Sequence, residues 1–241
     1  MAERTVGLLH PGEMGAAVGA VLRAQGHRVL WASEGRSGAT RARAEAAGLE
    51  DGDVATAEVV FSICPPHAAL KVARSAGCAG LYVDANAVSP ATAGEVAAAV
   101  GDFVDGGIVG PPPREPGTTR LYLSGERAEE VAGLFRGSML DARVVENASA
   151  VKMAYAAWSK GTAAMLLAIR ELARRQGVEE TLLAEWDASL PDLRERYERA
   201  ERSAAAKGWR WVGEMEEIAA TFEANGLPGG FHRAAAEVFR T

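Results

Sequence analysis

The chain has 241 residues, of which 48% are hydrophobic and 24% are charged, and its formal net charge is −6. These values suit a globular protein of one large or two modest domains. They exclude nucleic acid as an expected partner, because an acidic chain lacks the basic surface that displaces counterions from phosphates. No apolar run approaches the roughly 18 residues of a membrane helix, so we expect no membrane partner either.

The cysteines and histidines indicate neither a metal site nor a disulfide framework. Only two cysteines are present, Cys64 and Cys78, and the four histidines have no ligand-like spacing. The first residues enter a predicted strand without a basic and then apolar leader, which favours a cytoplasmic protein. We therefore expect no bound metal and a cytoplasmic location.

The first predicted element is a strand at residues 5–10, a continuous apolar run typical of a strand buried on both faces of a parallel sheet. A glycine turn and a helix that stops at Gly26 follow it. Such a turn presents backbone N–H groups to a pyrophosphate, although only Gly12 and Gly15 match the GxGxxG fingerprint. The residues that we expect to bind a dinucleotide here are His10, Pro11, Gly12, Glu13 and Met14.

A polar cluster follows the second predicted strand, at residues 27–32. Ser33, Arg36 and Ser37 supply hydroxyls and a guanidinium, which suit the 2′-phosphate of NADP. Glu34, near the usual place of a ribose-binding acid, keeps NAD as the alternative cofactor. The other interpretation of this segment is the solvated start of a helix at residues 39–47.

Strands and helices continue to alternate up to residue 146. This pattern predicts an α/β fold, with a Rossmann-type, doubly wound and mostly parallel sheet in a dinucleotide-binding domain at residues 1–146. Ligands of such sheets bind at the carboxyl ends of the strands, where we expect Cys64, Pro65 and Pro66 to contact the cofactor. The further predicted strands lie at 59–64, 81–84, 103–109, 120–123 and 142–145, with helices at 67–75, after Pro90 to Val100, and at 126–136.

A long helix is predicted between the capping residue Asn147 and Gly177. Lys152, Tyr155 and Ser159 share one polar face of it. The helix opens an all-helical substrate and dimerisation domain at residues 147–241. At about 1.5 Å per residue the helix is roughly 43 Å long, so we expect a second copy of the chain to cover part of it in a homodimer. The remaining predicted helices lie at 179–189, 191–207, 211–225 and from residue 231 onwards.

This order of motifs resembles the 6-phosphogluconate dehydrogenase and 3-hydroxyisobutyrate dehydrogenase superfamily, in particular its short branch with a phosphogluconate-dehydrogenase-like C-terminal domain. The resemblance rests on residues 6–15, 84–90 and 105–111 and on Lys152. It implies that Lys152 is the catalytic lysine, which exchanges a proton with the substrate oxygen during hydride transfer. It also places Asn86 in the substrate loop, where a serine is common.

Departures from the family pattern concern the groups that hold the substrate. Val109 replaces a substrate-binding serine, Pro111 replaces a glycine, and Tyr155 stands where the family has an asparagine three residues after its lysine. A plain 3-hydroxy acid is therefore not implied as the substrate.

We predict an NADP-preferring oxidoreductase that transfers a hydride between nicotinamide and a small hydroxy or keto substrate, with Lys152 as general acid and base. Asn86 is expected to orient the substrate, and Tyr155 to assist Lys152. Two alternatives remain open. One is an imine reductase in which Tyr155 donates the proton, and the other is a non-catalytic NADP-binding protein.

Overall fold

The computed structural model describes residues 3–240, and the chain forms two compact units, Met1–Lys152 and Met153–Thr241. The division falls inside the long helix α6 (Ala148–Arg175), after Lys152. The domain boundary expected from the sequence lay before this helix. The first turn of α6 thus belongs to the same unit as the sheet.

The first unit is built on one sheet whose strands all come from residues 5–144. The strands are β1 (Thr5–Leu8), β2 (Arg28–Trp31), β3 (Glu50–Asp51), β4 (Val59–Ser62), β5 (Leu81–Asp84), β6 (Phe103–Val109), β7 (Thr119–Ser124) and β8 (Leu140–Val144). They form an eight-stranded sheet in the order β3-β2-β1-β4-β5-β6-β7-β8. Pairing is parallel throughout except between β6 and β7, which are antiparallel. The predicted Rossmann-type, mostly parallel sheet is therefore confirmed.

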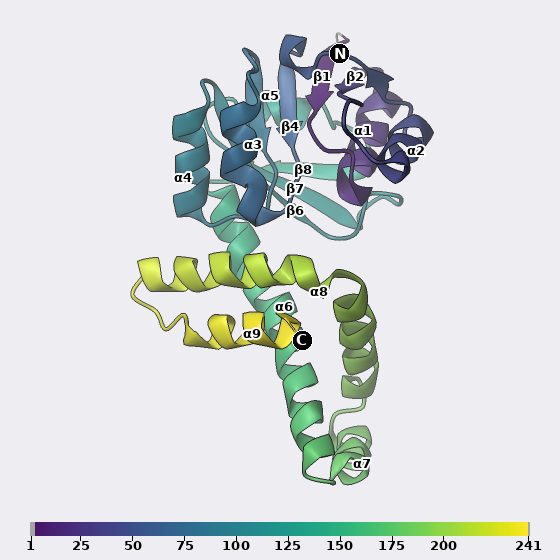
Figure 1. The fold of residues 1–241 in the computed structure, drawn as a ribbon, viewed down its shortest axis with the longest axis vertical. Coiled ribbons are helices and arrows are strands. Elements are labelled where there is room, and N and C mark those ends of the chain that lie inside the picture. The colour runs from purple at the N-terminus through teal and green to yellow at the C-terminus, as the bar shows by residue number, and fades with distance from the viewer. Residues whose placement is uncertain (1–2, 241) are drawn as a thin grey trace. The chain divides into compact units, whose positions relative to one another are not determined.

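Helices cover both faces of this sheet, as a doubly wound fold requires. They are α1 (Glu13–Ala24), α2 (Gly38–Ala46), α3 (Ala69–Ser75), α4 (Pro90–Ala99) and α5 (Ala128–Gly133), with the short 3₁₀ helices η1 (Val54–Thr56) and η2 (Pro66–Ala68). Figure 1 shows α3 and α4 side by side on one face. The helix α5 is shorter than the one predicted at 126–136, and the two-residue strand β3 was missed because its Glu-Asp sequence carries no strand pattern.

Alternation along the central strands divides the core between the two faces. Val59 and Phe61 pack into one cluster with apolar residues of α1 and α5, whereas Val60 packs into the other with residues of α3 and α4. Successive side chains of a strand point to opposite faces of the sheet, so a strand that is apolar at every position must be covered on both. Packing on both faces of the sheet therefore explains why the central strands are continuous apolar runs in the sequence.

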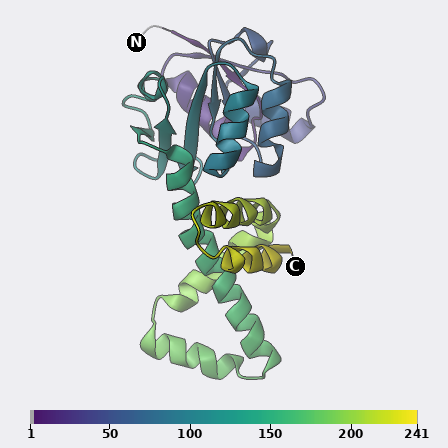
Figure 2. The ribbon, with the colours of Figure 1, turned by 90° about the vertical axis from the view of Figure 1, so that its left-hand side faces the viewer.

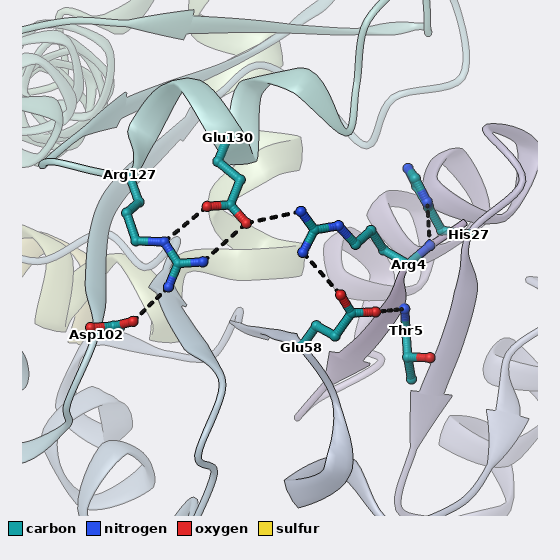
Figure 3. A network of polar contacts seen from close by, with 7 residues as sticks. All are labelled: Arg4, Thr5, His27, Glu58, Asp102, Arg127 and Glu130. Atoms are coloured by element: carbon teal, nitrogen blue, oxygen red, sulfur yellow. Dashed lines mark hydrogen bonds and ion pairs between the residues drawn. The ribbon is translucent and has the colours of Figure 1, made fainter. Parts of the chain in front are cut away.

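Ion pairs close the edge of the sheet at which β1, β4 and β6 begin (Figure 3). Arg4 contacts Glu58 at 2.9 Å and Glu130 at 3.3 Å, and Arg127 contacts Glu130 at 2.9 Å and Asp102 at 2.5 Å. These side chains are partly exposed, so each pair contributes little to stability. The opposite edge, where the parallel strands end, is the one that carries the loops of the candidate site.

The second unit is helical. After α6 it contains α7 (Glu179–Ser189), α8 (Leu193–Ala224) and α9 (Gly230–Arg240). The prediction of two helices at 191–207 and 211–225 was wrong, because both belong to α8, a single helix of 32 residues. Gly208 costs a helix only about 1 kcal/mol relative to alanine, and no proline interrupts the segment. The ribbon of α8 nevertheless changes direction along its length (Figures 1 and 2).

The long helix α6 begins and ends close to the predicted positions. The Asn147 side chain accepts a hydrogen bond from the Ala150 N–H at 2.8 Å, and Gly177 has a φ of 71°, in the left-handed region that favours glycine. Among residues 3–240 no helix combines the length and the apolar character that crossing a membrane requires.

Candidate functional site

The turn between β1 and α1 is closed tightly on its own backbone. The Gly12 N–H donates to the carbonyl of His10 at 2.9 Å, and a Cβ at Gly15 would clash with that same carbonyl. Around the Cβ position of Gly12, in contrast, no atom lies within 4 Å. The first N–H groups of a helix have no partner within the helix. The turn therefore brings the N-terminus of α1 to open space, which is the arrangement that binds phosphate groups.

Two arginines hold the carbonyls of this turn. Arg36 donates to the Leu9 carbonyl at 3.1 Å, and Arg43 donates to the Pro11 carbonyl at 3.4 Å. Burial, together with the nearby charge of Arg36, lowers the pKa of His10 below its ordinary value, so its ring stays neutral near pH 7. Positive charge thus gathers beside the N-terminus of α1. Arg43 was not among the predicted site residues, because its contact joins α2 to the turn after β1, 32 residues away, and leaves no local pattern.

The polar cluster around Ser33, predicted to bind the 2′-phosphate, contains an acidic residue, Asp51, that was not predicted from the sequence. Both the N–H and the hydroxyl of Ser33 donate to Asp51, at 3.0 and 2.5 Å, and these bonds lower the pKa of Asp51. Ser37 accepts a hydrogen bond from the Thr40 N–H at 3.3 Å and caps α2. Asp51 escaped notice because it lies on the short strand β3, far from Ser33 in sequence.

Asn86 lies buried between the ends of β4 and β5, with only 3% of its surface exposed. Its side-chain oxygen accepts from the Cys64 N–H at 2.5 Å, and its amide nitrogen donates to the Ser62 hydroxyl at 3.1 Å and to Asp84. The Asn86 N–H also donates to Asp84, at 3.3 Å. These bonds fasten the turn after β4 to the turn after β5.

Cys64, in the first of these turns, is held as a neutral thiol. Burial raises its pKa to about 11, and the nearby Asp84 carboxylate acts in the same direction. A thiol is a poor nucleophile until it ionises. Cys64 therefore contributes shape to the site rather than covalent chemistry.

The start of α6 is fastened to the sheet by side chains of β6 and β7. The Ala148 N–H donates to the Ser124 hydroxyl at 2.9 Å, and the Ser149 N–H donates to Asp105 at 2.8 Å. Ser124 also donates to Asp105, at 3.1 Å. Acceptors at a helix N-terminus satisfy N–H groups that the helix leaves open. They also determine where the following turn of α6, and Lys152 on it, lies above β6.

Lys152 is half-buried at the end of β6. Its Nζ donates to the Ile108 carbonyl at 2.7 Å. Gly107 lies directly beneath it, where a Cβ would come within 2.8 Å of the Lys152 Cβ. The missing side chain at Gly107 therefore permits the close approach of α6, and the carbonyl of Ile108 holds the ammonium group near the end of the strand.

The neighbouring strands β1, β4, β5 and β6 run parallel, so their carboxyl ends meet at one edge of the sheet. The glycine turn, Cys64, Asn86 and Lys152 follow one another along this edge. An anion-binding helix N-terminus and a fixed ammonium group can together hold a phosphorylated cofactor and exchange a proton with a bound substrate.

Tyr155 follows Lys152 in α6 but belongs to the second unit, where 51% of its surface is exposed. It borders a groove of about 800 Å³ between α6, α7 and α8. Ser159, also in this groove, is within 3.5 Å of the Ala156 carbonyl, a local bond common for serine in helices. In the described part of the chain, no three His, Cys, Asp or Glu side chains are grouped so that they could hold a metal ion.

Sequence comparison finds two matches that each cover part of the chain. Residues 173–241 match a family described as a domain of unknown function, DUF1932. A 28.5 kDa protein of Methanothermus fervidus, described as uncharacterised and lying in the 5′ region of a 7S RNA, is 31% identical over 138 residues. That match covers 54% of this chain and 53% of the relative, so it spans about half the length of that protein.

Solved structures resemble the chain over almost its whole length. The conserved protein MTH1747, of unknown function and with structural similarity to 3-hydroxyacid dehydrogenases, is 32% identical with a TM-score of 0.71, over 98% of this chain and 95% of that one. Salmonella typhimurium 3-hydroxyisobutyrate dehydrogenase is 15% identical, with a TM-score of 0.74 over 99% and 93% of the two chains. An Aspergillus terreus reductive aminase in complex with NADPH and ethyl levulinate is 17% identical, with a TM-score of 0.57 over 99% and 93%. The last two share the fold.

Proposed function

We propose that this chain, which belongs to the 6-phosphogluconate dehydrogenase and 3-hydroxyisobutyrate dehydrogenase superfamily, is an NADP-preferring oxidoreductase that acts on a small hydroxy or keto substrate. The observation that carries the proposal is the ammonium group of Lys152, fixed 2.7 Å from the Ile108 carbonyl. It lies at the sheet edge that also holds the phosphate-binding type of turn. A bound nicotinamide would supply or accept the hydride.

The chain's own residues would bind the cofactor and handle the proton. The N-terminus of α1, with the open space at Gly12, fits a pyrophosphate, and the residues predicted to bind it, His10 to Met14, form the turn and the start of this helix. An ammonium group has three donors, so Lys152 can keep its bond to Ile108 and still reach a substrate oxygen. Lys152 would give its proton to the oxygen as a carbonyl is reduced, and take it back as an alcohol is oxidised.

The preference for NADP rests on Arg36, Ser33 and Ser37, together with Arg43. A guanidinium binds phosphate through charge-assisted, bidentate bonds. Asp51 acts against this preference, because its carboxylate beside Ser33 would repel a phosphate and suits a ribose hydroxyl. NAD therefore remains the alternative cofactor, and the ratio of the two affinities is the quantity to measure.

The alternative enzymatic function is that of an imine reductase with Tyr155 as proton donor. The exposed hydroxyl-bearing side chain of Tyr155, three residues after Lys152 on α6, favours this candidate. It differs from the first candidate in the residue that moves the proton. The non-catalytic NADP-binding protein differs from both, because it needs neither residue.

Lys152→Met and Tyr155→Phe separate these functions. We expect Lys152→Met to lower kcat/KM by about 10²–10⁴ with a responsive keto substrate, the usual contribution of a general acid or base, while the Kd for NADP⁺ stays within threefold. Methionine is chosen because it keeps an apolar stem on α6. Tyr155→Phe should change turnover only a few-fold. Loss of turnover in Tyr155→Phe alone, seen with cyclic imines, would assign the imine reductase. Binding of NADP⁺ without turnover of either class would favour the non-catalytic protein.

We also infer a homodimer formed through the second unit. Large apolar side chains stay exposed along α6, including Trp158 at 66% and Leu172 at 59%. An apolar row of this kind on a folded unit is typical of a surface that another chain covers. We propose that a second copy of the chain covers this row, because these apolar side chains stay exposed although α7, α8 and α9 belong to the same unit.

A further inference from the structure

We propose that Asn86 is a positioning residue that shapes the cofactor site through the turn Cys64–Pro66, and does not itself bind the substrate. The inference rests on the proposed cofactor binding for its functional part. Its structural part, a clamp between the turns after β4 and β5, stands on hydrogen bonds alone. Resemblance to the family had placed Asn86 in the substrate loop, at a position where a serine is common.

The first argument is that the hydrogen-bonding groups of Asn86 are engaged within the protein. Its oxygen accepts from the Cys64 N–H, and the two hydrogens of its amide are directed to Ser62 and to Asp84. With 3% of its surface exposed, the side chain offers a substrate almost no accessible atoms. Buried amides that are fully bonded rigidify the segments they join.

The second argument is the chemistry of the turn that Asn86 holds. Pro65 and Pro66 have no N–H, and the N–H of Cys64 is taken by Asn86 at 2.5 Å. Three consecutive residues therefore present no backbone donor at the edge of the sheet where the glycine turn lies. A surface without backbone donors does not attract anions. It suits the flat face of a planar ring, and leaves phosphate binding to the N-terminus of α1.

The third argument is that a serine could not replace Asn86 in this role. A serine has one hydroxyl, and it is too short to span from Asp84 to the Cys64 N–H and also reach Ser62. Asparagine bridges all three because its amide has an acceptor and two donors on one plane. The departure from the family pattern at residue 86 thus has a physical function in this chain.

Hydrogen exchange of the apo protein tests the clamp directly. We expect the protection factor of the Cys64 amide to fall at least about tenfold in Asn86→Ala and in the milder Asn86→Ser, since tenfold corresponds to about 1.4 kcal/mol and a lost hydrogen bond is of that order. Asn225→Ala is the matched control. The Asn225 side chain is likewise hydrogen-bonded within the protein, to the Thr221 carbonyl at 2.8 Å, but it is exposed and lies in the second unit. Unchanged protection of Cys64 in both Asn86 variants would overturn the proposal.

Calorimetric titration with NADP⁺ tests the functional part. We expect Kd to rise about tenfold in Asn86→Ser and to stay unchanged in Asn225→Ala. Loss of Cys64 protection without any change in Kd would overturn the positioning role. A wild-type chain that binds neither NADP⁺ nor NAD⁺ would contradict the proposed function instead, and the exchange experiment would then decide the clamp by itself.

In Asn86→Asp, the pH dependence of NADP⁺ affinity distinguishes the hydrogen-bonding role from a merely structural one. The carboxylate keeps an acceptor for Cys64 but loses both donors and faces Asp84, whereas a protonated carboxyl regains one donor. Relative to wild type, NADP⁺ affinity of this variant should therefore recover as the pH is lowered from about 8 to about 5.5. An affinity ratio that stays flat over this range would count against the hydrogen-bonding role.

Discussion

Arg36 joins two loops of the candidate site, because its guanidinium donates to the Leu9 carbonyl from the loop after β2. We predict that Arg36→Ala raises the Kd for NADP⁺ about 10- to 100-fold, since a hydrogen bond to a charged group contributes about 1.5–3 kcal/mol. The Kd for NAD⁺, which lacks the 2′-phosphate, should change much less. Both constants can be measured by calorimetry. Equal losses for the two cofactors would assign Arg36 to holding the turn alone.

Asp51→Asn is the matched variant for this measurement. It keeps the shape of the side chain bonded to Ser33 but removes the negative charge that opposes a phosphate. We expect the ratio of NADP⁺ to NAD⁺ affinity to rise in Asp51→Asn and to fall in Arg36→Ala. Opposite shifts would place both residues at the 2′ position of the ribose.

His232 is the residue from which we predict a pH dependence of stability. It is 5% exposed, and its ring centroid lies 4.4 Å from that of Phe222. Burial lowers its pKa below 6.5. The unfolded chain therefore binds a proton more readily than the folded chain below pH 6.5. The free energy of unfolding should be undiminished above that pH and fall as the pH drops from 6.5 through the lower folded-state pKa.

Urea unfolding at a series of pH values checks this prediction. In His232→Phe the loss of stability on acidification should become smaller, because the titrating group is gone while an aromatic ring remains. It should not vanish, since burial also lowers the pKa of His10. An identical pH profile for the variant and the wild type would show that His232 takes no part in it.

At the scale of elements, the contact of α6 with β6 depends on Gly107. A methyl group there would lie 2.8 Å from the Lys152 Cβ and 3.1 Å from the Ala148 carbonyl. We predict that Gly107→Ala lowers the free energy of unfolding by about 1–3 kcal/mol, the usual cost of overpacking, and displaces Lys152 enough to reduce turnover. Thermal unfolding and a kinetic assay measure the two effects.

The control for this substitution is Gly94→Ala. Gly94 lies within α4, and no atom would come within 4 Å of its added Cβ. Alanine in a helix interior lowers the entropy of the unfolded chain, so stability should rise by about 0.4–1 kcal/mol. Similar destabilisation by both substitutions would refute the role of close approach at Gly107.

At the scale of the whole molecule, the row of exposed apolar side chains on α6 predicts a dimer. We expect sedimentation to report a dimer for the wild type and a monomer for Leu172→Glu, because a buried, unpaired carboxylate is costly at an interface. Leu227→Glu is the control, since Leu227 is 53% exposed but lies between α8 and α9. A monomeric wild type, or a dimer that survives Leu172→Glu, would contradict the proposed interface.

Several features of this protein were predictable from local patterns. The sequence located the apolar runs of the central strands, the glycine turn before α1, and the ends of α6 at Asn147 and Gly177. Each depends on neighbouring residues, through strand periodicity, glycine conformation or helix capping. The sequence prediction failed at α8, which is one continuous helix where two helices were predicted at 191–207 and 211–225.

What the sequence by itself determined is the order of elements and therefore the edge of the sheet at which ligands bind, because alternating strands and helices with right-handed connections allow few other arrangements. Only the tertiary structure decided the partners of the site residues. Lys152 bonds to the Ile108 carbonyl 44 residues away, Ser33 bonds to Asp51 18 residues away, and Asn86 bonds to Cys64 22 residues away. No local pattern encodes such pairs, since they form only when distant strands lie side by side.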